Sequence, residues 1–417
     1  MSGEASRADE ADTGSAALPG VPTRFRLSEG GLLHALLVRL RLASRGEDPN
    51  GDRTWRRVVA LAAVAWVPLA VLSVVPGVLD GTPVAHAFLH DFVPHVRYLV
   101  TLPLLVIADA LVDPALAAII RSVGSSRIIP EEANPGFQAA LEALARGRDS
   151  RLADVVVLGL AVLGAAHHLG ALGPVSLPYP ERSWELAQTA AGIRVTAAGW
   201  WSALVSVPLL QLLLLRWLWR SWLWAVFLRQ VSRIPLRLEP SHPDLVGGLG
   251  ILPSGQGALV FVWVAYGATF AATLAQEIVA GKLTLTGVGP YALGYVAASL
   301  VVNAWPLLFF TGRLIDAQRR GRMIYGALGY QLVRAFDDRW HGVDGGNLGK
   351  KLLTSNDSSA IADFTALFAN VRAMRRAPLD PGEFVVQAVL LALPFGLLVL
   401  TEVPFADVLK RLLDSLL

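Results

Sequence analysis

The chain of 417 residues contains no cysteine. Without a thiol it can form no disulfide, no thiolate metal site, no iron–sulfur cluster and no cysteine nucleophile. Charge is scarce as well: charged residues make up 17% of the chain, whereas hydrophobic residues make up 54%. This composition is too apolar for a soluble globular protein.

Several familiar signatures are also missing. No HExxH or CxxCH motif occurs, and no internal repeat suggests an inverted-repeat transporter. The run Gly345–Lys350 superficially suggests a phosphate loop, but Asp344 replaces its first glycine and Lys351 replaces the Ser/Thr that would hold Mg²⁺. No apolar run precedes Arg57, so the first span is expected to act as the targeting signal. With no catalytic motif, we name no catalytic residue and do not predict an enzyme.

What the sequence does contain is seven long apolar stretches. About 20 helical residues, at about 1.5 Å each, cross a hydrocarbon core of about 30 Å. The last stretch is the shortest and carries Gln387 and Pro394, so six crossings with a re-entrant last segment is the alternative. The stretches cover approximately residues 57–79, 97–120, 152–173, 195–215, 257–280, 290–311 and 384–400. The predicted fold is an all-α, polytopic transmembrane helix bundle.

The basic residues fall almost entirely on alternate sides of these stretches. Nine lie before the first stretch or at its first residue, Arg57, and the loops after the second, fourth and sixth carry five, five and eleven, which makes thirty of the 36. The positive-inside rule therefore predicts a cytoplasmic amino terminus and an outer carboxyl terminus. Basic loops beside spans meet the bilayer and its anionic headgroups, so no nucleic-acid partner is expected. The arginine bias, with only four lysines, is typical of GC-rich bacterial coding, and we expect a bacterial inner (plasma) membrane.

Four regions follow from these patterns. Residues 1–56 form a cytoplasmic segment, in which 1–23 are expected to be disordered and 28–43 to form an amphipathic surface helix with Ser28 as N-cap. Residues 57–312 form a six-span bundle. Residues 313–382 form a cytoplasmic helical hairpin, and 383–417 hold the last span and an amphipathic tail. The tryptophans between Arg216 and Trp224 are interpreted as an inner aromatic belt.

Asp109 and Asp113 are the ion- or proton-binding candidates. A carboxylate at membrane depth costs about 2.5–3.5 kcal/mol on insertion scales, so it usually faces the protein interior or water. Asp113 precedes Pro114, which is a favourable N-cap and N1 pair, so the second span would end near Val112. Asp109 would then be the only intramembrane carboxylate. Its nearest basic partners by depth would be Arg216 or Arg313, and such a pair would make the site structural.

A second group of candidates is the set of histidines expected on the outer side. His86 and His90 are four residues apart, which places both imidazoles on one face of a helix. An imidazole–carboxylate set suits a metal, and paired histidines suit haem, but this spacing also arises by chance. We therefore predict no cofactor, and keep metal or haem as an alternative. The candidate set is His86, His90, His95, His167, His168 and Glu277, with Asp91 beside it.

The loop before the fifth span is the third candidate. It reads Ser-His-Pro-Asp-x-x-Gly-Gly-Leu-Gly from Ser241 to Gly250. Asp244 can cap the following turn, and closely spaced glycines allow close backbone approach. The alternative is a short re-entrant turn that lines a vestibule. Its candidate residues are His242, Asp244, Gly247, Gly248 and Gly250.

Several strings resemble a family of bacterial multi-pass membrane proteins. They are the Ser241–Gly250 motif, Arg146-Gly-Arg-Asp-Ser150, Arg320-Gly-x-x-x-Tyr-Gly-x-Leu328 and Phe336-Asp-Asp-Arg-Trp340. An acidic residue at Asp109, after a Pro-Leu-Leu run, also fits that family. The resemblance covers most of the chain from Arg57 onward and implies a multi-pass membrane protein, but no activity.

Three functions remain open. The preferred one is permeation of ions, protons or a small solute past Asp109 and the glycine loop. The alternatives are a non-catalytic membrane scaffold or sensor that acts through the basic cytoplasmic hairpin, and a metal- or haem-binding protein that uses the outer histidines. The sequence indicates no protein partner and no substrate. A water-lined path to Asp109 would favour permeation, whereas a sealed core would favour a scaffold.

Overall fold

The predicted all-α membrane architecture is confirmed. A computed structural model describes residues 25–31, 39, 52–79, 84–171, 184–189, 192–340 and 357–401. Within these residues, seven helical stretches are long and apolar enough to cross a membrane. They are Thr54–Pro76, Phe92–Ser125, Glu131–Leu169, Ala197–Arg233, Ile251–Val279, Leu285–Trp340 and Pro381–Val399. Most of the predicted 28–43 surface helix, the segment 1–23 that was predicted to be disordered, and the predicted amphipathic tail beyond residue 401 lie outside the described residues.

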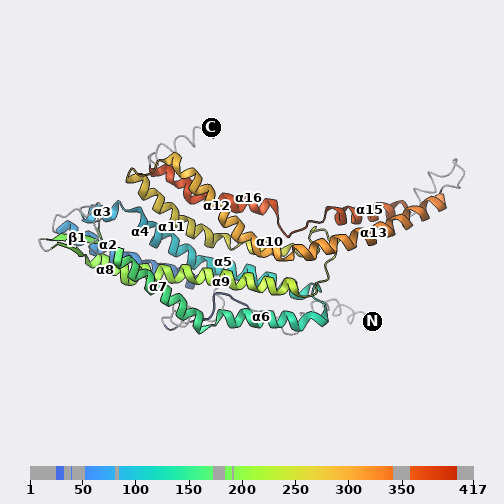
Figure 1. Cartoon of the computed structure of the whole chain (residues 1–417), viewed down its shortest axis with the longest axis horizontal. Helices are drawn as coiled ribbons and strands as arrows, with labels where there is room; N and C mark the ends of the chain where they lie inside the picture. The colour runs from blue at the N-terminus through green and yellow to red at the C-terminus, as the bar shows by residue number, and fades with distance from the viewer. Residues whose placement is uncertain are drawn as a thin grey trace, which may run out of the picture.

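The helices pack in series across the molecule (Figure 1). α6 and α7 pack on α9, α9 on α5, α5 on α11, and α11 on α16, while α2 packs on α5. Their bounds are α2 Asp52–Leu79, α3 Val84–Leu89, α4 Phe92–Val96, α5 Leu102–Ser125, α6 Asn134–Arg148, α7 Arg151–Ala171, α8 Ala197–Trp201, α9 Val207–Arg233, α10 Ile251–Gly257, α11 Val260–Val279, α12 Gly289–Ala304, α13 Thr311–Trp340, α15 Asp357–Ala373 and α16 Pro381–Gly396.

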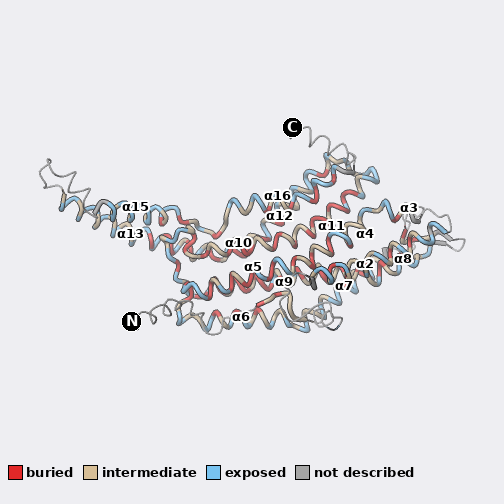
Figure 2. Tube along the Cα trace, turned by 180° about the vertical axis from the view of Figure 1, so that it is seen from behind, coloured by how far each residue is buried: buried red, intermediate tan, exposed pale blue. Residues whose placement is uncertain are grey.

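Burial follows this order of packing. Figure 2 shows the buried positions concentrated along α5, α9 and α11, with exposed positions on the outer helices and on the α13–α15 pair. Exposed valines and leucines of α2 and α7 form apolar faces suited to lipid, for which the bilayer is the solvent. The buried core therefore follows α5, α9 and α11 along the length of the molecule.

Two membrane helices begin with a π-helical turn, η1 (Arg97–Thr101) before α5 and η4 (Ser202–Ser206) before α9. Each is followed by a proline at the second residue of the next helix, Pro103 and Pro208. Proline has no N–H for the usual i−4 bond, and a widened turn accommodates the missing donor. The chain thereby continues in one direction through both prolines.

The second span does not end near Val112, so that expectation was wrong. α5 runs without interruption from Leu102 to Ser125 and contains Pro114 in its interior. Asp113 is therefore not an N-cap, and it is 5% exposed within the helix. Packing of α5 against α2, α9 and α10 outweighs the local signal of the Asp-Pro pair.

α6 and a β-hairpin are elements that sequence analysis did not identify. α6 buries Phe137, Ala140, Leu141 and Leu144 at helical spacing against α9. The hairpin pairs β1 (Leu186–Thr189) with β2 (Gly192–Val195), with Leu186 opposite Val195. It packs beside α8, at the end of the bundle opposite to α13 and α15 (Figure 1).

The seventh stretch lies alongside α11 and α12. Its first turn is near Gly257 at the end of α10, because a Cβ on Gly257 would lie 3.8 Å from Glu383 Oε2. Its other end, with Phe395 and Leu398, packs with Ala271 and Val288 in a separate apolar cluster. This helix thus runs from one end of α11 to the other, as expected of a crossing rather than a re-entrant turn.

Two of the four α9 tryptophans that were predicted to form a boundary belt are buried in the core instead. Trp217 and Trp224 are 2% and 0% exposed, whereas Trp222 is 55% exposed. Trp217 donates to the carbonyl of Leu105 at 2.9 Å, and Trp219 donates to that of Gly147 at 3.2 Å. Trp217 and Trp224 are buried because other helices, among them α5 and α6, pack on this part of α9, so both belong to the core.

Candidate functional site

Asp109 lies in a buried ion-paired cluster. Its side chain is 11% exposed, and its oxygens accept from Arg220 Nη1 at 2.6 Å and from Arg57 Nη2 at 2.9 Å. Arg220 belongs to α9 and Arg57 to α2, so Asp109 joins three helices. The prediction that Arg216 or Arg313 pairs with Asp109 was wrong. The guanidinium group of Arg216 donates to the carbonyl of Gly30. That of Arg313 donates to the carbonyls of Ser232 and Arg233.

Asp113 lies one turn further along α5, and its carboxylate binds the segment around Ser28, before the first membrane helix. It accepts backbone N–H groups of Leu27 at 3.0 Å and Ser28 at 3.1 Å, and also the Ser28 hydroxyl. Ser28, predicted as an N-cap, therefore donates to a distant carboxylate. A carboxylate that accepts several N–H bonds is well satisfied without a bound ion.

The segment Phe25–Gly31, here termed the N-terminal strap, covers this cluster. Three arginines donate to its carbonyl oxygens, with Arg148 to Arg26 and Arg220 to Ser28 both at 2.9 Å, and Arg216 to Gly30. Leu27 is 1% exposed. Gly30 has a φ of +103°, and a Cβ there would lie 2.0 Å from an oxygen of Asp149, so the strap requires glycine at this turn.

A cavity of about 210 Å³ lies beside the cluster, between the strap, α7 and α9. Arg148, Arg216, Arg220 and Asp154 provide its polar groups, and the remaining lining is largely aliphatic. The cavity reaches Arg220, which contacts Asp109, and all three arginines that donate to the strap. Asp109 itself is not among the lining residues, because both of its oxygens face guanidinium groups.

The glycine loop is organised around Asp244. Its carboxylate accepts the N–H groups of Val246 at 2.9 Å, Gly248 at 3.0 Å and Gly250 at 2.9 Å, and lies 2.8 Å from His242 Nδ1. Burial disfavours the ionised form, but these hydrogen bonds outweigh it and hold the pKa of Asp244 below its usual value. An open cavity of about 630 Å³ lies beside the loop. The Asp244 oxygens, however, already accept hydrogen bonds from N–H groups of the loop itself.

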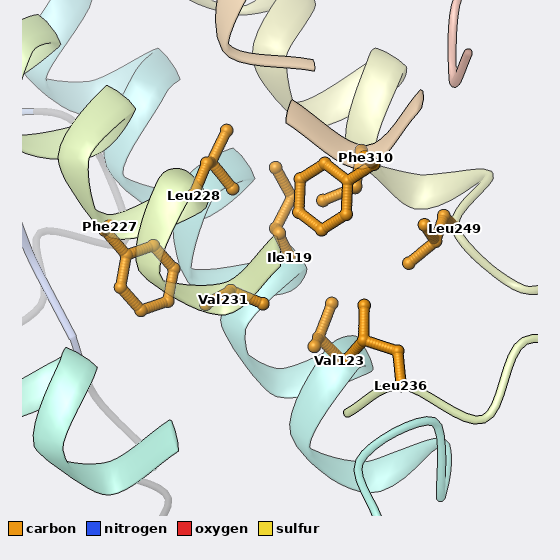
Figure 3. Close-up of a pocket in the computed structure, with 9 residues that line it drawn as sticks. Ile119, Val123, Phe227, Leu228, Val231, Leu236, Leu249 and Phe310 are labelled. Carbon is orange, nitrogen blue, oxygen red and sulfur yellow. The ribbon is translucent and has the colours of Figure 1, made fainter. Parts of the chain in front are cut away.

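The glycines of this loop allow its path. Gly247 and Gly248 have φ values of +69° and +96°, a region that residues with a Cβ rarely adopt. Behind the loop, Leu249 and Leu236 meet Ile119, Val123 and Phe310 around a cavity of about 10 Å³ (Figure 3). Its lining is entirely apolar, so it is a packing gap and offers no group for a polar ligand.

The histidines make separate contacts. The rings of His86 and His90 stack at 3.8 Å, so their in-plane lone pairs run parallel instead of pointing at one centre. His95 accepts from the indole of Trp66 at 3.0 Å, and His168 contacts Glu185 at 3.1 Å. His167 is exposed.

The nearby carboxylates also have protein partners. Glu277 pairs with Lys282 at 3.4 Å. Asp91 accepts the Trp184 indole at 2.8 Å and caps α4 through Val93, while burial raises its pKa. Across the described residues no group of three or more His, Asp or Glu side chains is arranged to hold a metal ion.

Sequence analysis did not identify a buried polar junction between α9, α10, α12 and α16. Gln256 accepts the Trp224 indole at 2.7 Å and donates to the carbonyl of Asn303 at 2.8 Å. Asn303 donates in turn to Gln387 at 2.9 Å. These three amide side chains are 2%, 3% and 8% exposed, so this is one of the most deeply buried polar groups of the described chain.

Comparison with known proteins adds no assignment: no protein-family model, no curated protein and no solved structure matches this chain.

Proposed function

We propose that the protein is a membrane-anchored scaffold, in which the bundle positions the α13–α15 hairpin for binding another protein. The observation that carries this proposal is the apolar surface of the hairpin beyond the bundle. Large exposed apolar patches outside lipid are typical of protein interaction sites. The exposed side chains on this hairpin are Met323, Ile324, Leu328, Tyr330, Val333 and Leu367, at 45–67%.

The length of the sixth span supports a position beyond the bilayer for these residues. The sixth span begins at Leu285, and about 20 helical residues from there already cross about 30 Å of hydrocarbon. Met323 lies 38 residues beyond that start. α13 and α15 also extend past the other helices along the long axis of the molecule (Figure 1). The exposed apolar residues therefore lie in water unless a partner covers them.

The hairpin is firmly connected to the bundle at its base. Gln318 donates to the carbonyl of Met374, and a Cβ on Gly321 would lie 2.5 Å from Pro240 of the glycine loop. The hydroxyl of Tyr325 donates to Ser241 at 2.9 Å. The glycine loop thus holds the base of the α13–α15 hairpin in place. In the proposed scaffold, this contact is the role of the close-packed backbone of the loop.

Photo-crosslinking in cells tests this proposal. A photoreactive phenylalanine analogue at Tyr330 is expected to give a discrete protein adduct, which Ile324→Glu abolishes without changing the unfolding midpoint. The matched control is the same analogue at Val162, a 58% exposed apolar position on α7, where only lipid adducts are expected. The proposal fails if both positions give the same adducts, or if the Tyr330 adduct survives Ile324→Glu.

The proposed orientation places the hairpin in the cytoplasm, in the inner membrane of a bacterium. The partition of basic residues supports it, because thirty of the 36 lie on the hairpin side. Reporter fusions after Trp340 and after Gly281 are expected to give cytoplasmic and outer activity, respectively. The reverse pattern would place the hairpin outside.

Permeation is the second candidate, favoured by the cavity that reaches Arg216 and Arg220 beside Asp109. The two arginines on Asp109 speak against a freely exchanging carboxylate there. Under this candidate, Asp109→Asn abolishes pH-dependent flux in proteoliposomes that hold the same amount of folded protein as those of the parent. Unchanged flux, or no flux in the parent protein, would exclude it.

A further inference from the structure

The ends of three helices meet at the buried polar junction. α10 ends at Gly257 before α11 begins, and α12 ends at Ala304, where the chain tightens into a 3₁₀ segment. α16 begins at Pro381 beside them. Interrupted membrane helices expose backbone carbonyl groups, and in many membrane proteins such carbonyls coordinate small cations. The junction therefore combines buried amides with helix ends.

Two oxygens at this junction lack a hydrogen-bond donor among the described residues. They are Oδ1 of Asn303 and Oε2 of Glu383, each with no solvent contact of its own. The other Glu383 oxygen accepts the Ser254 hydroxyl at 2.7 Å. No Lys, Arg or His of the described chain forms an ion pair with Glu383. The junction thus contains a half-buried carboxyl group that has no basic partner among the described residues.

The two residues that carry these oxygens line the same small space. This cavity of about 10 Å³ has Asn303, Glu383, Gln256, Gln387 and Asp380 as its polar lining residues. This volume corresponds to about one water-sized occupant. Both unpartnered atoms are acceptors, so the occupant has to be positive or has to donate hydrogen bonds. A buried acceptor without a donor destabilises the fold, and a charged one does so more strongly.

We infer that this junction binds one monovalent cation, with Na⁺ as the fitting ion. Carboxylate and amide oxygens are hard ligands suited to hard cations. A single carboxylate balances a single positive charge, whereas a divalent ion would leave an excess charge in a buried site. Asn303 is fixed by Gln256 and Gln387, so its Oδ1 is held in place for the ion. This site is independent of the hairpin and of the proposed scaffold function.

Equilibrium binding of radioactive sodium to the purified full-length protein tests the inference. The parent protein is expected to bind one sodium ion per chain saturably. Its thermal unfolding midpoint is expected to rise with NaCl, but not with choline chloride at equal ionic strength, since a ligand that binds only the native state stabilises it. Absence of saturable sodium binding would overturn the inference, whatever the variants do.

Glu383→Gln is the decisive variant. The carboxamide removes the charge, and its N–H₂ can donate to Asn303 Oδ1 in place of the ion. Sodium binding is therefore lost, while the unfolding midpoint in choline rises toward that of the sodium-loaded parent. The matched control is Glu142→Gln, whose carboxylate is 70% exposed on α6 and which should keep the sodium response. A sodium response that persists in Glu383→Gln would place the ion elsewhere.

Discussion

Replacing Asp109 with asparagine is expected to destabilise the bundle by about 3–5 kcal/mol, which is the range for removing one partner of a buried ion pair. The substitution keeps the size of the side chain but leaves Arg57 and Arg220, whose side chains are 17% and 7% exposed, without their anion. At an effective dielectric constant of about 20, two charges 4 Å apart attract by about 4 kcal/mol, consistent with that range. Asp113, one turn away, retains part of the negative charge, so the lower half of the range is expected.

The assay is the free energy of unfolding of the purified protein in mixed detergent, with the Arg220→Gln variant and the double variant completing a cycle. Because the two groups touch, the double variant should be less destabilised than the sum of the single ones. Glu142→Gln, which breaks the exposed pair with Arg146, is the control and should change stability by less than about 0.5 kcal/mol. A stability of Asp109→Asn equal to that of the control would refute a structural role for the cluster.

Three further predictions concern the glycine loop and the polar junction. Asp244 has a lowered pKa in the folded state, so its stabilising contribution is present above the unfolded value of about 3.9 and is lost as the pH falls through the folded value. The unfolding midpoint of Asp244→Asn should therefore fall less below about pH 4 than that of the parent. Gly248→Ala, at a φ of +96°, should cost about 1–2 kcal/mol, measured as the free energy of unfolding. Trp224→Phe keeps an aromatic ring but removes the indole N–H, so Gln256 Oε1 loses its donor and the smaller ring leaves a gap; chemical denaturation should show a loss of at least about 1–3 kcal/mol.

Much of the architecture could be predicted because hydropathy acts locally. A span needs only length and apolar composition, so all seven stretches were identifiable without knowledge of their neighbours. α6 was also identifiable in principle, since Phe137, Ala140, Leu141 and Leu144 already have helical spacing. Its short apolar face is difficult to recognise because the surrounding segment is rich in charge, which is typical of a loop.

The partners of buried polar residues could not be predicted, because they are set by packing between distant segments. Arg220 lies 111 residues from Asp109, and Asn303 lies 84 residues from Gln387. Depth along a helix suggested Arg216, but the rotation of α9 directs Arg220 to Asp109 instead. The same rotation buries Trp217 and Trp224, which a composition rule assigned to the membrane boundary. In the sequence, Gln387 indicates only that the seventh stretch is less apolar than the others, although its side chain belongs to the polar junction.

The N-terminal strap has a consequence for the order in which this protein is made. Ser28 leaves the ribosome long before Arg220, 192 residues later, whose guanidinium binds its carbonyl. At about 5–20 residues per second, the strap waits about 10–40 s for that contact. The contacts from Asp113 and Arg148 become available in the interval, whereas that from Arg216 to Gly30 also comes late, 186 residues after Gly30. The first described segment of the chain is therefore among the last to settle, and it can settle only after α5, α6 and α9 have been inserted in register. The strap therefore binds in its final position only when these three helices have assembled correctly.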